Sequence, residues 1–315
     1  MIPGGASPSS SRTWLALVFL WIVWGSTYLG SAVLIESIPA YLGLALRFAV
    51  AGLLMVIWVL ACERSALRVT LRELFSTAVM GLSFMGFSIS ITTLAVQYVP
   101  TGVAALLVSI LPVWIVVIRL ITHDRPVWQT ILGVVIGLAG LAYMLVPGGT
   151  QVEAGTERDV VIWSSVIVLS SITWAITAWW SQRVPTPRNG IVSASYQMLF
   201  GAGALLIVAF ARGEQWAFDA TTPRSWVALV YLTTIGSVMA WIAFVWLLQN
   251  APLSLTATYA YVNPVVAVLL GLLFHGETIT VDVVIGCLVV VVGVVLVVSG
   301  ESIGIFARSK ASKLT

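Results

Sequence analysis

Long uninterrupted runs of apolar residues dominate the sequence, and they do not alternate with polar residues as half-buried strands do. A helix that crosses a bilayer needs about 20 mainly apolar residues. Backbone groups in lipid are satisfied only within helices or closed barrels. The runs therefore predict an all-α membrane protein with ten transmembrane helices, over residues 13–35, 39–62, 74–96, 99–121, 127–146, 160–181, 190–210, 225–248, 252–274 and 281–300.

Composition agrees with this pattern. Of the 315 residues, 60% are hydrophobic and 9% are charged, whereas a soluble globular chain carries about 25% charged residues. Such a chain cannot cover itself with polar surface, which excludes an ordinary cytosolic enzyme, a nucleic-acid binder and a disordered protein. Cys62 and Cys287 lie in apolar runs and are expected to be small buried hydrophobes. The sequence has no metal-ligand spacing, so we expect no metal and no cofactor.

The basic residues predict the orientation of the helices, because cytoplasmic loops are enriched in Lys and Arg. With both termini in the cytoplasm, the outer segments hold three basic residues: Arg158, Arg212 and Arg224. The inner segments then hold eleven: Arg12, Arg64, Arg68, Arg72, Arg119, Arg125, Arg183, Arg188, Arg308, Lys310 and Lys313. We therefore expect a multi-pass protein of the bacterial inner membrane with both termini inside.

The two halves of the chain match each other at a slowly drifting offset. At an offset of 150 positions, Trp24 corresponds to Trp174 and Arg47 to Gln197. At an offset of 152, the matching residues are Gln97 and Gln249, Pro100 and Pro252, Pro112 and Pro264, and His123 and His275. At an offset of 153, Gly133 matches Gly286 and Gly140 matches Gly293. Each copy has five predicted spans. Because five is odd, the second copy enters the membrane from the opposite side, an inverted-repeat arrangement common in secondary transporters.

The repeat divides the chain into five parts. Residues 1–12 are a predicted disordered cytoplasmic N-terminus, 13–146 the first repeat, 147–159 an outer linker, 160–300 the second repeat and 301–315 a cytoplasmic tail. A cleaved signal peptide is disfavoured, because the first apolar run is longer than a typical signal h-region and no A-x-A site ends it. Close-packing glycines at 133, 137 and 140 indicate helix packing within one chain rather than dimerisation.

Several segments resemble the EamA family of the drug/metabolite transporter superfamily. They are WGSTY at Trp24–Tyr28, Arg47–Phe48, VPTGVAALLVSILPV at Val99–Val113, SITWA at Ser171–Ala175 and SLTATYAYVNPVVAVLLG at Ser254–Gly271. The resemblance covers nearly the whole chain and is strongest to the bacterial amino-acid and metabolite exporters. It implies a monomeric bundle of ten helices in two inverted repeats, with a central cavity walled by the first, third, fourth, sixth, eighth and ninth spans.

Arg47 is the one formal charge placed well inside a predicted span. Ionisable groups in lipid are costly and are functional candidates by default. One interpretation is that Arg47 attracts a carboxylate or phosphate of a substrate. The other is a structural arginine that snorkels outward or bonds backbone carbonyl groups. Its mate is the uncharged Gln197, so the two halves are not electrostatically equal.

Other polar and aromatic residues are candidates for the cavity wall. We expect substrate contacts from Trp24, Ser26, Thr27, Tyr28, Arg47, Ser90, Gln97, Trp174, Ser237, Trp241, Thr258, Tyr261 and Asn263, with Ser88, Thr92 and Thr93 as weaker candidates. The tryptophans could instead pack between helices, and the hydroxyls could bond carbonyls of their own helix. Pro112 and Pro264 each remove a helix hydrogen bond and are candidate hinges or gates, or purely structural kinks.

The sequence disfavours enzymatic activity. Glu36, Glu73, Asp124, Glu277 and Asp282 all fall at span ends, so no carboxylate relay is expected at mid-membrane, and no Walker A sequence is present.

The expected function is a secondary transporter that exports amino acids or related amphipathic compounds by alternating access. A multidrug exporter of the same fold and a non-transporting membrane receptor or scaffold remain as alternatives. The expected partners are a small-molecule substrate and the bilayer, and no nucleic acid.

Overall fold

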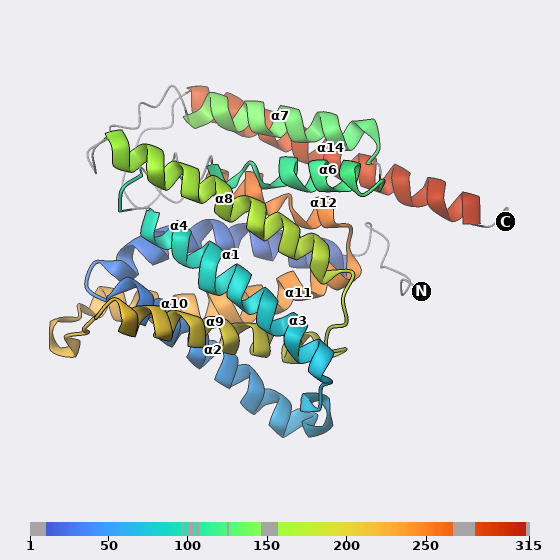
Figure 1. The fold of residues 1–315 in the computed structure, drawn as a ribbon. Helices are drawn as coiled ribbons and strands as arrows, with labels where there is room; N and C mark the ends of the chain where they lie inside the picture. The colour runs from blue at the N-terminus through green and yellow to red at the C-terminus, as the bar shows by residue number, and fades with distance from the viewer. Residues whose placement is uncertain are drawn as a thin grey trace.

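The computed structural model describes residues 11–95, 97–99, 104, 107–124, 126–145, 157–266 and 281–312, and these contain helices and no strand. The predicted linker up to residue 156, His275, and the two ends of the chain at 1–10 and 313–315 lie outside the described residues. The elements in order are α1 Ser11–Ile35, α2 Ala40–Cys62, η1 Arg64–Leu67, α3 Leu71–Gly81, η2 Leu82–Ile89, α4 Ser90–Ala95, α6 Leu111–Ile121, α7 Trp128–Leu145, α8 Glu157–Ser181, α9 Gly190–Ala211, η3 Phe218–Ala220, α10 Pro223–Thr233, η4 Thr234–Met239, α11 Ala240–Asn250, α12 Leu253–Thr256 and α14 Val281–Ser312 (Figure 1).

Six apolar segments are helices of membrane-spanning length within this part of the chain. They are Ser11–Ile35, Ala40–Cys62, Leu71–Ala95, Val161–Ser181, Gly190–Ala211 and Pro223–Asn250. These confirm the predicted spans in the corresponding six places. Shorter apolar helices occupy Leu111–Ile121, Trp128–Gly140 and Val284–Gly300. Helix α14 continues past the predicted span end at residue 300 to Ser312.

In the predicted spans over 99–121 and 252–274, the described residues are not one uninterrupted helix. A turn at Ser109 and Ile110 precedes α6, and a turn follows Thr256 before the chain becomes helical again over 259–266. Pro112 lies in the first turn of α6, where proline removes no intrahelical bond. It therefore begins a helix there and does not kink one.

Pro264, in contrast, lies inside the helical stretch 259–266 and cannot donate a hydrogen bond to the carbonyl of Ala260, four residues earlier. The hydroxyl of Ser109 donates to that carbonyl instead, at 2.6 Å. Both groups are buried. The interruption before α6 in one half thus satisfies the backbone vacancy that proline creates in the other half.

Corresponding helices of the two halves pack on each other. Helix α2 lies along α9, and α7 lies along α14 (Figure 1). Helix α1 packs on α10 and α11, and its counterpart α8 packs on η2 and α4. The α7–α14 contact depends on glycine: a Cβ atom on Gly293 would lie 2.6 Å from the nitrogen of Gly137 and 2.7 Å from the oxygen of Gly133. These glycines thus allow the backbones of α7 and α14 to approach closely within the chain.

The helical stretches Leu71–Ala95 and Pro223–Asn250 each contain a π-helical segment, at matching positions. The segment η2 lies between α3 and α4, and η4 lies between α10 and α11. Their first residues, Leu82 and Thr234, differ by 152 positions, the offset that also relates Pro112 to Pro264. Segments of π-helix are rare and frequently lie at functional sites. Their recurrence makes this depth of the bundle the first place to look for one.

The two ends of the bundle are held by different polar contacts. At the end where α1 begins, called the Arg119 end, the amide of Asn189 donates to the carboxylate of Glu63 at 3.0 Å. At the opposite end, called the Glu214 end, the carboxylate of Glu214 accepts from the backbone nitrogens of Tyr41 and Leu42 at 3.2 and 2.9 Å. Glu214 thereby caps α2, which begins after Pro39, a residue without a capping side chain.

Candidate functional site

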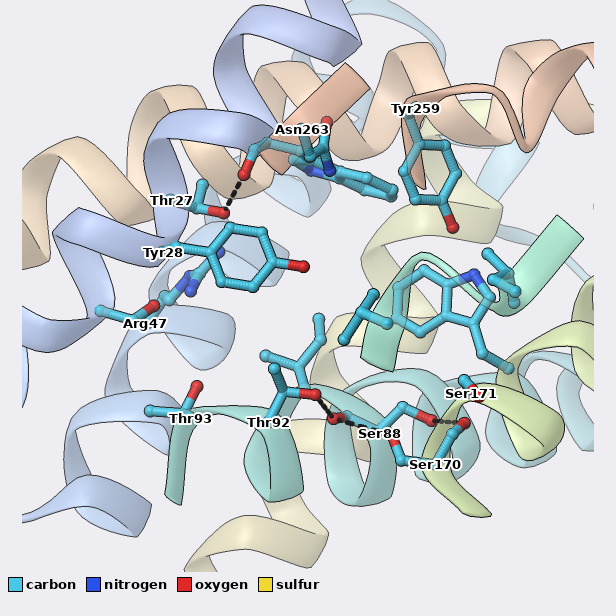
Figure 2. Close-up of a pocket in the computed structure, with 16 residues that line it drawn as sticks. Thr27, Tyr28, Arg47, Ser88, Thr92, Thr93, Ser170, Ser171, Tyr259 and Asn263 are labelled. Carbon is cyan, nitrogen blue, oxygen red and sulfur yellow. Dashed lines mark hydrogen bonds between the residues drawn. The ribbon is translucent and has the colours of Figure 1, made fainter. Parts of the chain in front are cut away.

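A central cavity of about 120 Å³ lies between the two halves. Its wall comes from α1, α2, η2, α4, α8 and the helical stretch 259–266, together with residues at the start of α6 (Figure 2). Its polar and aromatic wall residues are Trp24, Thr27, Tyr28, Ser31, Arg47, Ser88, Thr92, Thr93, Ser170, Ser171, Trp174, Tyr259 and Asn263. The cavity therefore combines one cation with many hydroxyl groups and several rings.

Arg47 is the only charged residue among the described residues of this wall. Its side chain is buried, and its Nε donates to the hydroxyl of Ser237 at 2.7 Å. No carboxylate of the described residues forms an ion pair with it. Its side chain turns into the space that Thr93 and Tyr28 also face (Figure 2). A buried cation without a counter-ion is costly and is stabilised by an anion that reaches it. The cavity is thus suited to a carboxylate or phosphate.

The equivalent position on the other side of the bundle is packed shut. Gln197, the mate of Arg47, is buried, with its amide nitrogen donating to Ser193 at 3.0 Å and its oxygen accepting from the indole of Trp241 at 3.2 Å. Helices α3 and α9 approach so closely that a Cβ atom on Gly81 would collide with the carbonyl oxygen of Gln197, and one on Gly201 would lie 2.9 Å from that of Gly81. The two sides differ in charge and in packing.

A cluster of aromatic rings lies beside the cavity. The ring centroids of Trp24 and Phe244 are 4.9 Å apart, and those of Phe84 and Trp174 are 4.6 Å apart. The ring of Trp241 contacts the rings of both Trp24 and Trp174. Trp24 and Trp174 line the cavity, whereas Trp241 and Phe244 lie beyond them on α11, which runs toward the Arg119 end. The cluster therefore closes the cavity on its Arg119 side.

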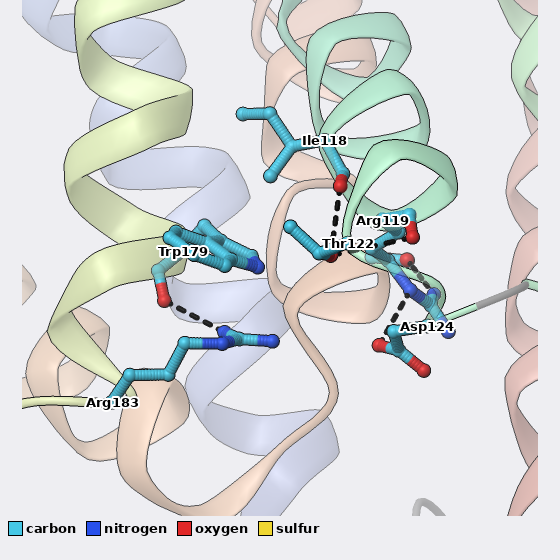
Figure 3. A network of polar contacts seen from close by, with 7 residues as sticks. Ile118, Arg119, Thr122, Asp124, Trp179 and Arg183 are labelled. Atoms are coloured by element: carbon cyan, nitrogen blue, oxygen red, sulfur yellow. Dashed lines mark hydrogen bonds and ion pairs between the residues drawn. The ribbon is translucent and has the colours of Figure 1, made fainter.

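The Arg119 end carries a network of polar contacts (Figure 3). Arg119 donates to the hydroxyl of Ser254 at 2.6 Å and forms an ion pair with Asp124 at 3.2 Å. Arg183 lies over the ring of Trp179, 4.1 Å from its centroid, and donates to its carbonyl at 2.8 Å. Burial lowers the pKa of Arg183, and nearby Asp124 partly opposes this. The bond from Arg119 to Ser254 joins α6 to α12, whereas the contacts of Arg183 and Trp179 lie within the segment at the end of α8.

Six of the predicted site residues line the cavity: Trp24, Thr27, Tyr28, Arg47, Trp174 and Asn263. Asn263 is buried, and when its amide is oriented with the nitrogen toward the carbonyls of Tyr259 and Trp21, it donates to them at 2.9 and 3.2 Å. Trp21 belongs to α1, so these bonds join the stretch 259–266 to α1.

Other predicted residues lie outside the wall. Ser237 and Trp241 lie behind the wall. Ser237 accepts a hydrogen bond from Arg47, and Trp241 donates one to Gln197. Ser26 bonds the hydroxyl of Tyr231 and a carbonyl of its own helix, and Ser90 donates to the carbonyl of Gly86 at 2.7 Å. The backbone-bonding alternative therefore holds for these two hydroxyls.

Three further predicted residues lie elsewhere in the bundle. Thr258 accepts from the indole of Trp21 at 3.2 Å and donates to the carbonyl of Leu255 at 2.7 Å. Tyr261 is buried in a cluster with valines of α6, α7 and α14. Gln97 belongs to a second cavity near the Glu214 end.

Ser31, Ser170 and Ser171 line the cavity and were missed by the sequence analysis. Helical spacing could have found them, because Ser31 lies four residues after Thr27, and Ser170 lies four before Trp174. Cys62 corrects another expectation: it ends α2 and is exposed rather than buried. In the described part of the chain, no group of three or more His, Cys, Asp or Glu residues could hold a metal ion.

Comparison with known proteins gives the family. The model of the EamA-like transporter family matches residues 12–146 and 161–299, one match in each half. The uncharacterized inner membrane transporter YedA of Escherichia coli K12 is 33% identical over 288 residues, covering 91% of this chain and 90% of that protein. The uncharacterized transporter YoaV of Bacillus subtilis is 23% identical, covering 90% of this chain and 95% of that protein.

A solved crystal structure, titled only as that of a protein, has a TM-score of 0.73 at 19% identity, covers 91% of this chain and 96% of its own, and shows a shared fold. The two family matches fall on the two halves that the internal repeat defines, and the apolar helices span both. The chain therefore belongs to the EamA-like transporter family and is a multi-pass membrane transporter, not an enzyme.

Proposed function

We propose that this chain is a secondary transporter that exports a small amphipathic metabolite carrying a carboxylate, with amino acids as the best fit. In this proposal Arg47 binds the carboxylate, and the rings of Trp24 and Trp174 contact the apolar part of the substrate. The observation that carries it is the geometry of Arg47: a buried cation whose Nε is held by Ser237 and which lines the cavity without a protein counter-ion among the described residues.

The dimensions and chemistry of the cavity support a small substrate. A space of about 120 Å³ suits a metabolite and not a polymer. Hydroxyl groups of Ser31, Thr92 and Thr93 offer both donors and acceptors, as a zwitterion requires. A carboxylate and a guanidinium form the strongest class of hydrogen bond between side chains, with two parallel donors available. Export is the direction that we propose by resemblance to characterised family members.

We also propose that the two halves are inverted repeats of five helices, with ten spans and both termini in the cytoplasm. The reciprocal packing of α2 on α9 and of α7 on α14 supports a two-fold relation between the halves. The end of the bundle at which each helix begins or ends places each basic residue. The Arg119 end holds Arg12, Arg64, Arg68, Arg72, Arg119, Arg183 and Arg188, and the Glu214 end holds Arg158, Arg212 and Arg224. The positive-inside rule then makes the Arg119 end cytoplasmic.

With that orientation the aromatic cluster and the Arg119 network close the inner side, and the cavity lies on the outer side of the cluster. Alternating access requires the cluster to part and the Glu214 end to close. The two π-helical segments are the proposed joints of this motion, since η2 supplies Ser88 to the cavity wall and η4 holds Arg47 through Ser237. We propose that the protein acts as a monomer, as its family resemblance implies.

A second candidate is export of an aromatic or cationic compound, favoured by the ring cluster at the cavity. Two variants separate the candidates. A carboxylate substrate predicts that Arg47→Gln abolishes flux, and an aromatic cation predicts that Trp174→Ala reduces flux more than Arg47→Gln. Glutamine already fits the equivalent buried position at Gln197, so Arg47→Gln is expected to fold.

The experiment is counterflow into proteoliposomes with a panel of amino acids, sugars and cationic dyes. We expect flux of at least one amino acid, its loss in Arg47→Gln, partial recovery in Arg47→Lys, and no change in Arg224→Gln. Arg224 is a matched control because it is exposed at the Glu214 end and lies outside the cavity wall. Undiminished amino-acid flux in a folded Arg47→Gln variant, or flux of dyes alone, would contradict the proposal.

A further inference from the structure

A second cavity, of about 230 Å³, lies at the Glu214 end. Its wall includes Tyr41 at the start of α2, Trp163 on α8, and Arg212 and Glu214 after α9. Gln97 and Tyr98, which follow α4, complete the wall. The site described above does not use these residues. The described wall of the second cavity contains a charge of each sign.

The two charged side chains of this cavity, Glu214 and Arg212, differ in how the protein holds them. Both carboxylate oxygens of Glu214 accept from backbone nitrogens at the start of α2, which fixes the carboxylate in place. Each carboxylate oxygen can accept more than one hydrogen bond, so Glu214 keeps capacity for a further donor. Arg212 is exposed and forms no ion pair among the described residues, and its guanidinium carbon lies 5.7 Å from the ring centroid of Tyr41. Within the described part of the chain, this cavity thus pairs a fixed anion with a cation that has no carboxylate partner.

The remaining wall is aromatic. The rings of Tyr98 and Trp163 are stacked, with centroids 5.0 Å apart and an angle of 3° between their planes. A stacked pair is rigid and offers a flat apolar surface with polar edges. A free guanidinium, a fixed carboxylate and an apolar wall together match the three parts of an amino acid: carboxylate, ammonium and side chain.

The two cavities both draw wall residues from α2 and α4, and the second lies nearer the Glu214 end. Tyr41 and Arg47 are six residues apart on α2, a rise of about 9 Å at 1.5 Å per residue. On α4, Thr93 lines the central cavity and the next residue, Leu94, lines the second. The cavity that contains Arg212 is therefore a neighbour of the central cavity on its Glu214 side.

We infer that the second cavity is a binding site for the same zwitterionic substrate, a vestibule in which Arg212 takes the carboxylate after Arg47 releases it. This inference rests on the proposed function and adds a second site to it. The ammonium group lies against Glu214, and the side chain lies on the rings of Tyr98 and Trp163. Gln97 lines the same cavity and is assigned no contact with the substrate, so it can be replaced by a reporter.

A cysteine reporter tests the vestibule without relying on transport. In a chain carrying Cys62→Ala and Cys287→Ala, Gln97→Cys places one thiol in the second cavity, and its modification rate by a membrane-impermeant maleimide is measured in proteoliposomes. L-serine, L-leucine and L-phenylalanine are added one at a time. A bound amino acid slows modification by the factor 1 + [L]/Kd, about threefold at twice its Kd.

The variants separate the two sites. We expect protection of Gln97→Cys in the presence of Arg47 and also in Arg47→Gln, its loss in Arg212→Gln, and its recovery in Arg212→Lys. A cysteine at Arg224, exposed at the same end but outside the cavity, is expected to react at the same rate with and without amino acid. Recovery with lysine shows that loss in Arg212→Gln reflects charge and not misfolding.

Two results would overturn the inference. Loss of protection in Arg47→Gln would mean that Arg47 forms the one site, and full protection in Arg212→Gln would mean that Arg212 is not a ligand. Counterflow of the same amino acids distinguishes this failure from failure of the proposed function. Amino-acid flux without protection of Gln97→Cys refutes the vestibule alone, whereas absence of both flux and protection refutes the proposed function and the vestibule with it.

Discussion

Ser237→Ala tests whether the second half of the chain holds the proposed substrate-binding cation of the first half. The hydroxyl of Ser237 accepts a hydrogen bond of 2.7 Å from Nε of Arg47, and both residues are buried. Alanine keeps the backbone and the Cβ atom and removes this one acceptor. The change leaves a charged donor in a place where no other described residue accepts from it.

The magnitude follows from the type of bond. A hydrogen bond to a charged group contributes about 1.5–3 kcal/mol to the free energy of unfolding. We expect Ser237→Ala to lower that free energy by this amount. Without Ser237 the guanidinium is no longer held toward the substrate, and since 1.4 kcal/mol is a factor of ten, the KM for substrate is expected to rise about tenfold to a hundredfold.

The assay is counterflow in proteoliposomes together with thermal unfolding of the purified protein. Ser237→Thr keeps the hydroxyl and is expected to retain the wild-type KM. Ser193→Ala is the matched control, because Ser193 is equally buried and its hydroxyl accepts from Gln197, the mate of Arg47. Ser193→Ala is expected to lower Tm with no change in KM. If Ser237→Ala behaves in the same way, Ser237 contributes stability and does not orient Arg47.

Two further predictions concern packing. Gly293→Ala should lower the free energy of unfolding by about 1–3 kcal/mol, because its Cβ atom would lie within 2.7 Å of backbone atoms of α7, whereas Gly203→Ala, with nothing within 4 Å, should leave Tm unchanged. Equal Tm values for the two variants would contradict the close approach of α7 and α14. Trp174→Ala should make proteoliposomes lose a preloaded amino acid faster, because it opens the ring cluster on the Arg119 side of the cavity, and Trp174→Phe should leak less. A leak equal to that of the wild type would show that the cluster does not seal the cavity.

Hydropathy predicted the long helices because membrane insertion depends on the length and composition of one segment. It could not predict the interruptions before α6 and after Thr256. These depend on a bond between segments distant in sequence, since Ser109 satisfies the carbonyl of Ala260 that Pro264 leaves open. The π-helical segments left no signal in the sequence for a similar reason, because one extra residue per turn does not change mean hydropathy.

The site was predicted in its main chemistry but only partly in its membership. Arg47 stood out because a charge in an apolar run is rare, and the repeat pointed to Trp24 and Trp174 as a pair. Which face of a helix meets the cavity depends on packing that one sequence does not encode locally. Trp241 therefore lies behind the wall on Gln197, and Gln97 lies one cavity further along.

The bond between Arg47 and Ser237 has a consequence for the synthesis of the protein. The two residues are 190 positions apart, so the cation of α2 emerges from the ribosome well before its acceptor. In the same interval α2 lacks α9, and α7 lacks α14, the helices that cover them in the finished bundle. Until the second half is made, the guanidinium of Arg47 therefore lacks its acceptor, and the glycines of α7 lack the helix that packs on them. A chain truncated there would keep both of these features uncovered.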